Sequence, residues 1–288
     1  MLPDHLTTGT HVALDFGISN TDVVAAVNGE LHYWHQPYKG DPDAALIRDI
    51  LAVQGIELSQ LERLTVTGGR HKLLPAEMDG CPVVSIGEME AIGRGGQVLA
   101  IRAGLTADTP IMVVSAGSGT AVLFAHNNTY RHVTGTAVGG GTMLGLARLL
   151  VGTTNPQEID DLALQGSANH VDLTLGDVIT GEVGNLPVDA TAVHFGRIAR
   201  GDTTPTPADY AAAITSMVAQ TIALIATAAA PGAGASHVVI TGHMGDMASI
   251  RHIAKLVGHF YHTPIIVPDY AGYATALGAL FSPPSHLT

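Results

Sequence analysis

Residues 134–152, which read TGTAVGGGTMLGLARLLVG, combine a glycine turn with the start of a helix. Three successive glycines at 139–141 are followed by Thr142 and by an apolar run with helical spacing. Glycine lets a ligand or another backbone approach closely. A glycine loop that opens a helix also turns N–H groups and the positive end of the helix dipole toward an anion. Taken alone, this stretch is equally well interpreted as a phosphate-binding turn or as a tight turn needed only for packing.

Two further glycine turns each follow a short β-rich run. Residues 11–16 (HVALDF) lead into Gly17-Ile18-Ser19-Asn20, and residues 111–115 (IMVVS) lead into Ala116-Gly117-Ser118-Gly119. After each turn come a second strand, a hairpin through Asn28-Gly29 or Asn127-Asn128, and a third strand. The repetition predicts a duplicated α/β domain whose two glycine turns face each other across a cleft. We place the two halves at residues 1–107 and 108–288.

The remaining elements follow from periodicity and end signals. Asp41 and Pro42 are expected to cap and begin a helix. A second helix is expected over residues 86–103, and Glu88 and Glu90 lie in its first turn. Acids suit the dipole there, and a carboxylate at a helix start that faces a cleft can also act as a general base. Helices are also expected after Asn155-Pro156 and over residues 206–230, 247–257 and 272–280, with strands at 64–67, 82–85, 237–240 and 264–267.

Composition limits the class of protein. The 288 residues include 13 basic and 25 acidic side chains, which give a formal net charge of −12. No excess of Lys and Arg is present to neutralise phosphates, so neither a nucleic-acid partner nor a membrane surface is expected. The single cysteine, Cys81, excludes an intrachain disulfide. The N-terminal residues do not resemble a signal peptide, and the longest apolar stretch, residues 222–230, is shorter than the roughly 20 residues of a membrane span. A cytoplasmic location is expected.

The ordered motifs together resemble the type II pantothenate kinases (the fumble-like family) of the actin, sugar kinase and Hsp70 ATPase superfamily. The resemblance covers nearly the whole chain. Asp15-Phe16-Gly17 resembles the first phosphate loop, residues 67–69 a TGG turn, and residues 115–119 the second phosphate loop. Residues 133–150 are similar to a VTGT-x-x-GGGT-x-x-GL pattern, which is the closest match. Residues 175–179, 192–196, 239–243 and 271–280 resemble the later segments in the family's order.

The resemblance implies roles for these positions. Asp15 would hold Mg²⁺, and Glu88 would take the proton from the attacking hydroxyl. Phosphoryl transfer needs such positioning and charge neutralisation without a covalent intermediate on the protein. ATP would be held by Gly17, Ser19, Asn20, Ser115, Gly117, Ser118, Gly119, Gly139, Gly140, Gly141, Thr142 and Gly242. The acceptor side would include Arg131, Thr134, Gly135, Val193 and His194, with His132 as a catalytic residue at the position of a family arginine.

Five positions depart from the family pattern. Ile18 replaces a loop glycine, Asp22 a basic residue and His132 an arginine, and Val193 and His194 replace two serines. Arg131 does not automatically replace the missing arginine, because adjacent strand residues point to opposite faces. His132 could serve if it is protonated or donates as a neutral ring.

Two functions therefore stand side by side. One is an ATP-dependent kinase that converts pantothenate to 4'-phosphopantothenate, the first step of coenzyme A biosynthesis. The other is a non-catalytic or differently specific relative that binds a nucleotide, CoA or an acyl-CoA as a sensor or partner protein. The resemblance also implies a homodimer that pairs through the helix at 206–230.

Overall fold

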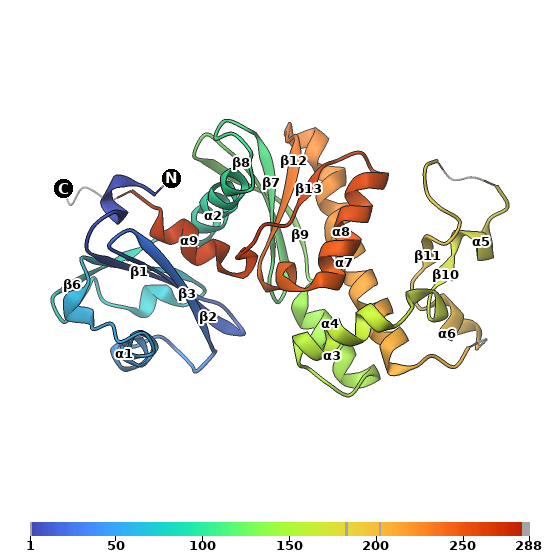
Figure 1. Cartoon of the computed structure of the whole chain (residues 1–288), viewed down its shortest axis with the longest axis horizontal. Coiled ribbons are helices and arrows are strands. Elements are labelled where there is room, and N and C mark those ends of the chain that lie inside the picture. Colours follow the sequence, from blue (N-terminus) through green and yellow to red (C-terminus); the bar gives the residue numbers. More distant parts are fainter. Residues whose placement is uncertain (1, 182–183, 202, 284–288) are drawn as a thin grey trace. The chain divides into compact units, whose positions relative to one another are not determined.

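The computed structural model describes residues 2–181, 184–201 and 203–283 (Figure 1). The chain forms two compact units. Unit 1 contains residues 1–113, 123–132 and 268–288, and unit 2 contains residues 114–122 and 133–267. Within unit 1, the C-terminal segment groups with the N-terminal one. The predicted boundary at 107/108 stays a prediction, and each unit is described by itself.

The first sheet has the strand order β3-β2-β1-β4-β6-β5. Strand β1 pairs antiparallel with β2 and parallel with β4, and β4 pairs parallel with β6. The hairpin from β2 to β3 turns through Asn28 and Gly29, both at positive φ, as the Asn-Gly signal predicts. Its strands and helices are β1 (Thr10–Phe16), β2 (Asn20–Val27), β3 (Glu30–Pro37), α1 (Ala44–Ala52), β4 (Arg63–Gly68), β5 (Glu77–Met78), β6 (Cys81–Ser85), α2 (Glu88–Arg102) and α9 (Ala274–Leu280).

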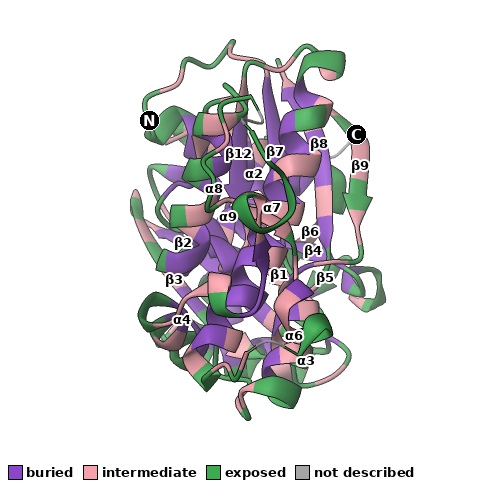
Figure 2. Cartoon of the chain, turned by 90° about the vertical axis from the view of Figure 1, so that its right-hand side faces the viewer, coloured by how far each residue is buried: buried purple, intermediate pink, exposed green. Residues whose placement is uncertain are grey.

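Both faces of this sheet are buried. The alternation of side chains along β1 places Val12, Leu14 and Phe16 in one apolar cluster, together with residues of α1. Ala13 belongs to the opposite cluster, which also contains residues of α2 and α9. Figure 2 shows the resulting band of buried residues along the strands.

Helices α2 and α9 pack backbone against backbone. A Cβ on Gly95 would lie 1.8 Å from the carbonyl oxygen of Ala274, and one on Gly278 would lie 1.9 Å from that of Ala91. The small residues of α9 therefore permit close approach, as the sequence predicts, and the partner is the glycine-rich face of α2. This packing fixes the helix that begins with Glu88.

The second sheet repeats the strand order of the first. Its order is β13-β12-β7-β8-β9, which corresponds strand for strand to β6-β4-β1-β2-β3. This equivalence confirms the duplicated α/β architecture. The elements are β7 (Ile111–Ala116), β8 (Thr120–His126), β9 (Thr129–Thr136), β12 (His237–Thr241) and β13 (Ile265–Ile266).

The connection from β9 to β12 is much longer than its counterpart between β3 and β4. The long helix α7 is surrounded by α3, α4 and α8 and forms the core of unit 2. The segment before α7 carries short elements that the sequence does not predict. The elements are α3 (Gly140–Leu150), α4 (Pro156–Gln165), β10 (Leu173–Thr174), α5 (Leu175–Val178), β11 (Thr191–Val193), α6 (Gly196–Arg200), α7 (Pro207–Ala233) and α8 (Ala248–Phe260).

Two sequence-based expectations are corrected. Helix α1 is capped by Asp43, whose carboxylate accepts from the Leu46 amide at 2.8 Å. Asp41 does not cap it and instead pairs with Arg70. In addition, α7 is long and apolar enough by length and composition to cross a membrane, although 67% of its most apolar window is buried within the fold. Burial on that scale is typical of a core helix.

Candidate functional site

Three segments of unit 2 meet at one end of strands β7 and β12. The turn after β7 closes with a hydrogen bond from the Gly117 amide to the Gly119 carbonyl (3.0 Å). The first amides of α3 donate to this turn: Gly140 N–H to the Gly117 carbonyl (2.8 Å) and Gly141 N–H to the Ser118 carbonyl (2.9 Å). The triple glycine and the second glycine loop are thus parts of one site.

The close approach explains the three glycines. A Cβ at Gly139 would lie 2.7 Å from the Ser118 carbonyl oxygen, and Cβ atoms at Gly140 and Gly141 would lie 3.0 Å from loop carbonyl oxygens. The amides of Gly140 and Gly141 already donate hydrogen bonds to carbonyl oxygens of the loop. The helix start therefore supports the loop directly, which corrects the expectation that these two N–H groups point freely at an anion. The part these glycines play toward a nucleotide stays a prediction.

A third glycine turn completes this end of the sheet. Gly242, after β12, has φ +90°, and a Cβ there would lie 2.3 Å from the Ala116 carbonyl oxygen. Thr241 Oγ1 donates to the Val114 carbonyl at 3.0 Å. Only glycine tolerates this conformation and contact together. Backbone groups of the segments at 115–119, 139–142 and 242–244 are thereby presented on a rigid base, an arrangement suited to a phosphate-containing ligand.

Side-chain hydroxyls tie the same region together. Thr120 Oγ1 donates to the Val138 carbonyl at 2.8 Å, and the Val138 amide donates to Thr136 Oγ1 at 3.1 Å. Thr142 Oγ1 is 3.3 Å from the Ala137 carbonyl oxygen. Ser115, Thr134 and Gly135 lie on β7 and β9, which lead into and out of this region.

In unit 1, Asp15 lies beside a matching glycine turn. Gly68, at the end of β4, has φ +93°, and a Cβ there would lie 2.6 Å from Asp15 Oδ1 and 2.6 Å from the Phe16 carbonyl oxygen. Thr67 is in register with Asp15, and its buried hydroxyl has no hydrogen-bond partner among the described residues. A carboxylate with neighbouring hydroxyl and carbonyl oxygens is the donor chemistry that Mg²⁺ uses in proteins.

The turn after β1 is tight and exposed. The Gly17 amide donates to the Asp15 carbonyl at 3.1 Å, and the Tyr38 amide donates to the Ser19 carbonyl at 2.9 Å. Ile18 keeps 82% of its surface exposed and is not among the residues at positive φ. The β-branched residue is therefore accommodated without backbone strain. Asn20 begins β2.

Glu88 occupies the first position of α2, after Gly87. It is exposed and has no hydrogen-bond or ion-pair partner in the part of the chain that the structure describes. Glu90, by contrast, pairs with Arg94 at 2.6 Å. The two acids of this helical turn thus differ, because Glu90 stabilises the helix while Glu88 remains available for chemistry.

Arg131 and His132 lie on opposite faces of β9. The Arg131 guanidinium stacks over Phe124, with its carbon 5.6 Å from the ring centroid. His132 shares a face with Tyr130, and a Cβ on Gly93 of α2 would collide with the Tyr130 ring at 2.2 Å. His132 is exposed, on the face of β9 from which Tyr130 packs against α2, and Arg131 does not replace it there.

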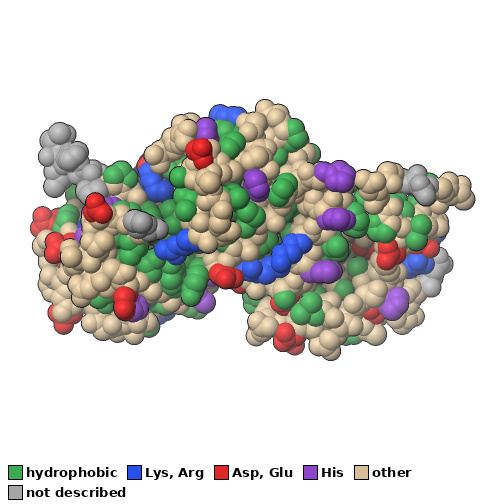
Figure 3. Space-filling view, turned by 45° about the horizontal axis from the view of Figure 1, so that its top comes forward, with side chains coloured by type: hydrophobic (Ala, Val, Ile, Leu, Met, Phe, Trp, Pro, Cys, Tyr) green, Lys and Arg blue, Asp and Glu red, His purple; other side chains and the backbone are tan. Residues whose placement is uncertain are grey.

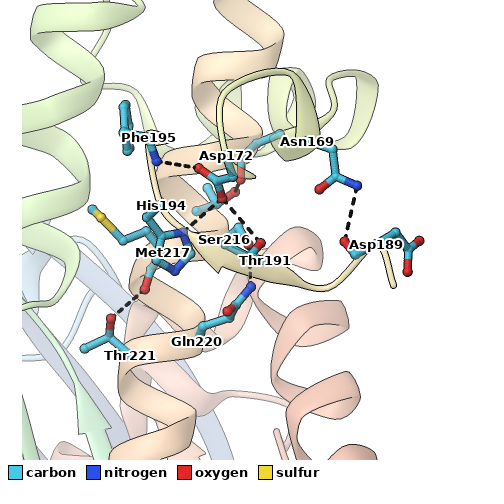
Figure 4. A network of polar contacts seen from close by, with 12 residues as sticks. Asn169, Asp172, Asp189, Thr191, His194, Phe195, Ser216, Met217, Gln220 and Thr221 are labelled. Atoms are coloured by element: carbon cyan, nitrogen blue, oxygen red, sulfur yellow. Dashed lines mark hydrogen bonds and ion pairs between the residues drawn. The ribbon is translucent and has the colours of Figure 1, made fainter. Parts of the chain in front are cut away.

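Val193 and His194 belong to the segment that precedes α7. Val193 is 47% exposed. His194 Nδ1 is 2.9 Å from Oδ2 of Asp172, a fully buried carboxylate (Figure 4). Asp172 is not among the residues predicted from the sequence, although a lone acid inside the apolar run Val171-Asp172-Leu173 is a recognisable signal of a buried charge.

Basic side chains are few in this acidic chain, which has 13 Lys and Arg against 25 Asp and Glu. On the face drawn in Figure 3, Lys and Arg side chains lie as separate groups among apolar and polar surface. The expectation that the protein has no nucleic-acid partner stays a prediction.

Solved structures of similar fold define the class. The activator of the 2-hydroxyisocaproyl-CoA dehydratase from Clostridium difficile, with bound ADPNP, has a TM-score of 0.61 at 17% identity, covering 94% of this chain and 93% of that chain. A ROK family glucokinase from Streptomyces griseus, in complex with glucose and AMPPNP, has a TM-score of 0.56 at 14% identity, covering 94% and 98%. The chain therefore has the duplicated actin-like (ribonuclease H-like) ATPase fold.

The sequence comparisons identify the family within that class. The Fumble family matches residues 88–282, and the chain belongs to it. A type II pantothenate kinase of Bacillus cereus (strain G9842) is 26% identical over 223 residues, which cover 76% of this chain and 81% of that protein. Another, of Oceanobacillus iheyensis, is 27% identical over 228 residues, covering 78% and 84%. The predicted resemblance is confirmed.

Proposed function

We propose that the protein is an ATP-dependent kinase that phosphorylates the primary hydroxyl of pantothenate. The observation that carries the proposal is the convergence of residues 115–119, 139–142 and 242–244 on one end of the second sheet, in a member of the Fumble family. Backbone-lined turns suit a polyphosphate in an acidic chain that is short of Lys and Arg.

The role proposed for each segment follows from its local geometry. Asp15 would hold Mg²⁺, which neutralises charge on the transferred phosphoryl group. Gly17, Ser19 and Asn20 would contact the phosphates from unit 1, and the three segments of unit 2 would contact the rest of ATP. The arrangement of the two units around the nucleotide stays a prediction.

Glu88 is proposed as the general base. It is exposed at the start of a helix whose other first-turn acid is already paired, and a base must reach the acceptor hydroxyl directly or through one water. Acceptor recognition is assigned to His132, Arg131, Thr134, Gly135, Val193 and His194. A homodimer and a cytoplasmic location remain part of the proposal, and CoA or an acyl-CoA is proposed as a further ligand.

A coupled assay of ADP release with ATP–Mg²⁺ tests the proposal. Pantothenate and pantetheine are compared as acceptors, and E88Q and E90Q are compared with the parent protein. Turnover that requires pantothenate, falls at least a hundredfold in E88Q and persists in E90Q is expected. Absence of ADP release with every acceptor would contradict the proposal.

The departures from the family pattern at Ile18, Asp22, His132 and Val193 favour a second candidate, a relative that binds nucleotide or CoA without turnover. Ile18 and His132 are exposed, and they stand where the resemblance implies a loop glycine and an arginine on the phosphate side. This candidate predicts thermal stabilisation by ATP–Mg²⁺ or CoA without ADP release. Sustained turnover would eliminate it.

A further inference from the structure

His71 is a buried histidine to which the proposed function assigns no role. It begins the short 3-10 turn His71–Leu73 that follows β4, and only 6% of its surface is exposed. Its Nδ1 lies 2.5 Å from the carbonyl oxygen of Gly68, the last residue of β4. Since a carbonyl oxygen only accepts, Nδ1 carries a proton and donates it to Gly68. The buried ring is therefore bonded directly to the glycine turn that ends β4.

The Gly68 carbonyl belongs to a peptide group that is hydrogen-bonded at both ends. The same peptide group contains the amide N–H of Gly69, which donates to the Phe16 carbonyl at 3.2 Å. His71 thus holds one end of this peptide group, and the last residue of β1 holds the other. Rotation of the peptide group would break both hydrogen bonds, so together they fix its orientation.

This peptide group adjoins the carboxylate of Asp15. Gly68 has φ +93°, and a Cβ there would lie 2.6 Å from Asp15 Oδ1. Phe16, which accepts the hydrogen bond from Gly69, directly follows Asp15 in the chain. A shift of the peptide group would therefore change the space and the backbone around the carboxylate. The contacts connect His71 to Asp15 through one intervening residue, Gly68.

A neighbouring ion pair is less able to fix the turn. Arg70 pairs with Asp41, but both side chains are more than half exposed. Exposed ion pairs contribute little to stability because water competes for both charges. The hydrogen bond of His71 is shielded from water, where an unpaired donor or acceptor is costly. His71 is therefore the stronger of these two restraints on the turn.

We propose that His71 is a positioning residue for Asp15. Its Nδ1–H fixes the Gly68–Gly69 peptide group, and this peptide group fixes the carboxylate that would hold Mg²⁺. The metal as ligand of Asp15 rests on the proposed kinase function. Replacing a residue that orients a metal ligand typically lowers metal affinity or activity by about ten- to a hundredfold. The proposal gives His71 no contact with ATP or with the acceptor.

Three substitutions separate this role from a purely structural one. H71N keeps an N–H donor at the place of Nδ1, H71Q carries its donor at the place of Nε2, and H71A has none. Mn²⁺ replaces Mg²⁺ as the probe, and water-proton relaxation measures its binding to the protein with ATP present. H71A and H71Q are expected to bind Mn²⁺ about tenfold more weakly than the parent protein, and H71N to bind it as the parent does. ATP binding in the presence of EDTA should stay unchanged in all three.

A double-mutant cycle tests whether His71 acts through Asp15. D15N alone should weaken Mn²⁺ binding, and adding H71A to D15N should weaken it no further, because the two residues act in series. H126A is the matched control, since His126 Nε2 also contacts a backbone carbonyl oxygen, that of Asp108 at 3.0 Å, but ends β8 of the other sheet. H126A should bind Mn²⁺ as the parent does.

The outcomes distinguish this proposal from the proposed function. Parent-like Mn²⁺ affinity in folded H71A, equal affinities in H71N and H71Q, or additive losses in the double mutant would each overturn the role of His71. Where H71A does not fold, the comparison of H71N with H71Q decides. A parent protein that shows the expected series of Mn²⁺ affinities but releases no ADP would sink the kinase function alone.

Discussion

The two glycine loops occupy equivalent places in the two sheets. β1 and β7 lead into them, and a Thr-Gly pair stands at the end of each neighbouring strand, Thr67-Gly68 closing β4 and Thr241-Gly242 beginning at the last residue of β12. Gly68 and Gly242 have φ +93° and +90°, and a Cβ on either would collide with the backbone at the end of the adjacent strand. Both copies thus keep the close contact between a turn glycine and the end of the adjacent strand, and this contact fixes the direction of each loop.

The loops differ in what they carry. The first presents the carboxylate of Asp15 and an exposed Ile18, and within the part of the chain that the structure describes no helix start donates amides to it as α3 does to the second. The second contains only small residues and lies under Gly139–Gly141. The difference indicates that the repeated scaffold was specialised, with charge placed in one copy and close backbone packing in the other.

The largest expected effect comes from removing the charge of the first loop. D15N should lower kcat about a thousandfold, because an amide neutralises less charge at the proposed metal and phosphate position. Steady-state kinetics and the Mg²⁺ dependence measure this. D161N, which changes an exposed acid of α4, is the control. Near-normal turnover in D15N would remove the functional contrast between the loops.

The shared backbone contact is tested by G68A and G242A. Each variant should lose about 3 kcal/mol of unfolding free energy, since positive φ and a backbone clash act together. Denaturant unfolding gives the values. Gly145 of α3 has open space around it, so G145A should be neutral or slightly stabilising. If only one of the two variants is destabilised, the turns are not equivalent.

The start of α8, the helix that follows the Gly242 turn, is held by a buried acid. Asp160 of α4 accepts from the Ala248 amide (2.8 Å) and from the Ser249 amide (2.9 Å) at the start of α8. D160A should destabilise the protein by about 2 to 3 kcal/mol, because it leaves those donors unpaired. D161A, one residue further along α4, should change the unfolding free energy by less than about 0.5 kcal/mol. Equal effects would show that the cap contributes nothing.

The connection between β9 and β12 contains Asp209, and its contribution to stability should decrease at acid pH. Burial alone would raise the pKa of Asp209, but hydrogen bonds from Ser167, Thr206 and His170 outweigh it and hold that pKa well below its usual range. The resulting stabilisation is present above about pH 4 and is lost as pH falls toward the folded-state pKa, about 2 kcal/mol in all. The unfolding free energies of the parent protein and D209N should therefore differ at pH 7, and the difference should shrink as the pH falls below about 4. A constant difference would contradict this assignment.

The smallest effect is expected at Ile18. Its side chain faces solvent and its backbone is unstrained, so I18G should change the KM for ATP by less than about twofold and stability by less than about 0.5 kcal/mol. A tenfold lower KM would mean that this isoleucine, rather than the charge of Asp15, sets the difference between the loops.

Local signals explain most of what could be predicted. The turns at Asn28-Gly29 and Asn127-Asn128 define their hairpins, and Thr206 begins α7 with a capping box. The correction at Asp41 arose because two aspartates flank Pro42, and only the carboxylate of Asp43 reaches the first helical amides.

Contacts between distant segments could not be read from the sequence. The pairing of Gly140 and Gly141 amides with the second loop joins segments far apart in the chain. Likewise, Asp172 meets His194 only because β10 and β11 pair. In both cases the local pattern marks an unusual residue, but tertiary packing decides what it contacts.

The most direct test of the kinase assignment follows the phosphoryl group itself. With [γ-³²P]ATP, Mg²⁺ and pantothenate, the parent protein should transfer label to pantothenate, and D15N should transfer about a thousandfold less while remaining folded. A folded parent protein that binds ATP–Mg²⁺ and transfers no label to pantothenate would contradict the account.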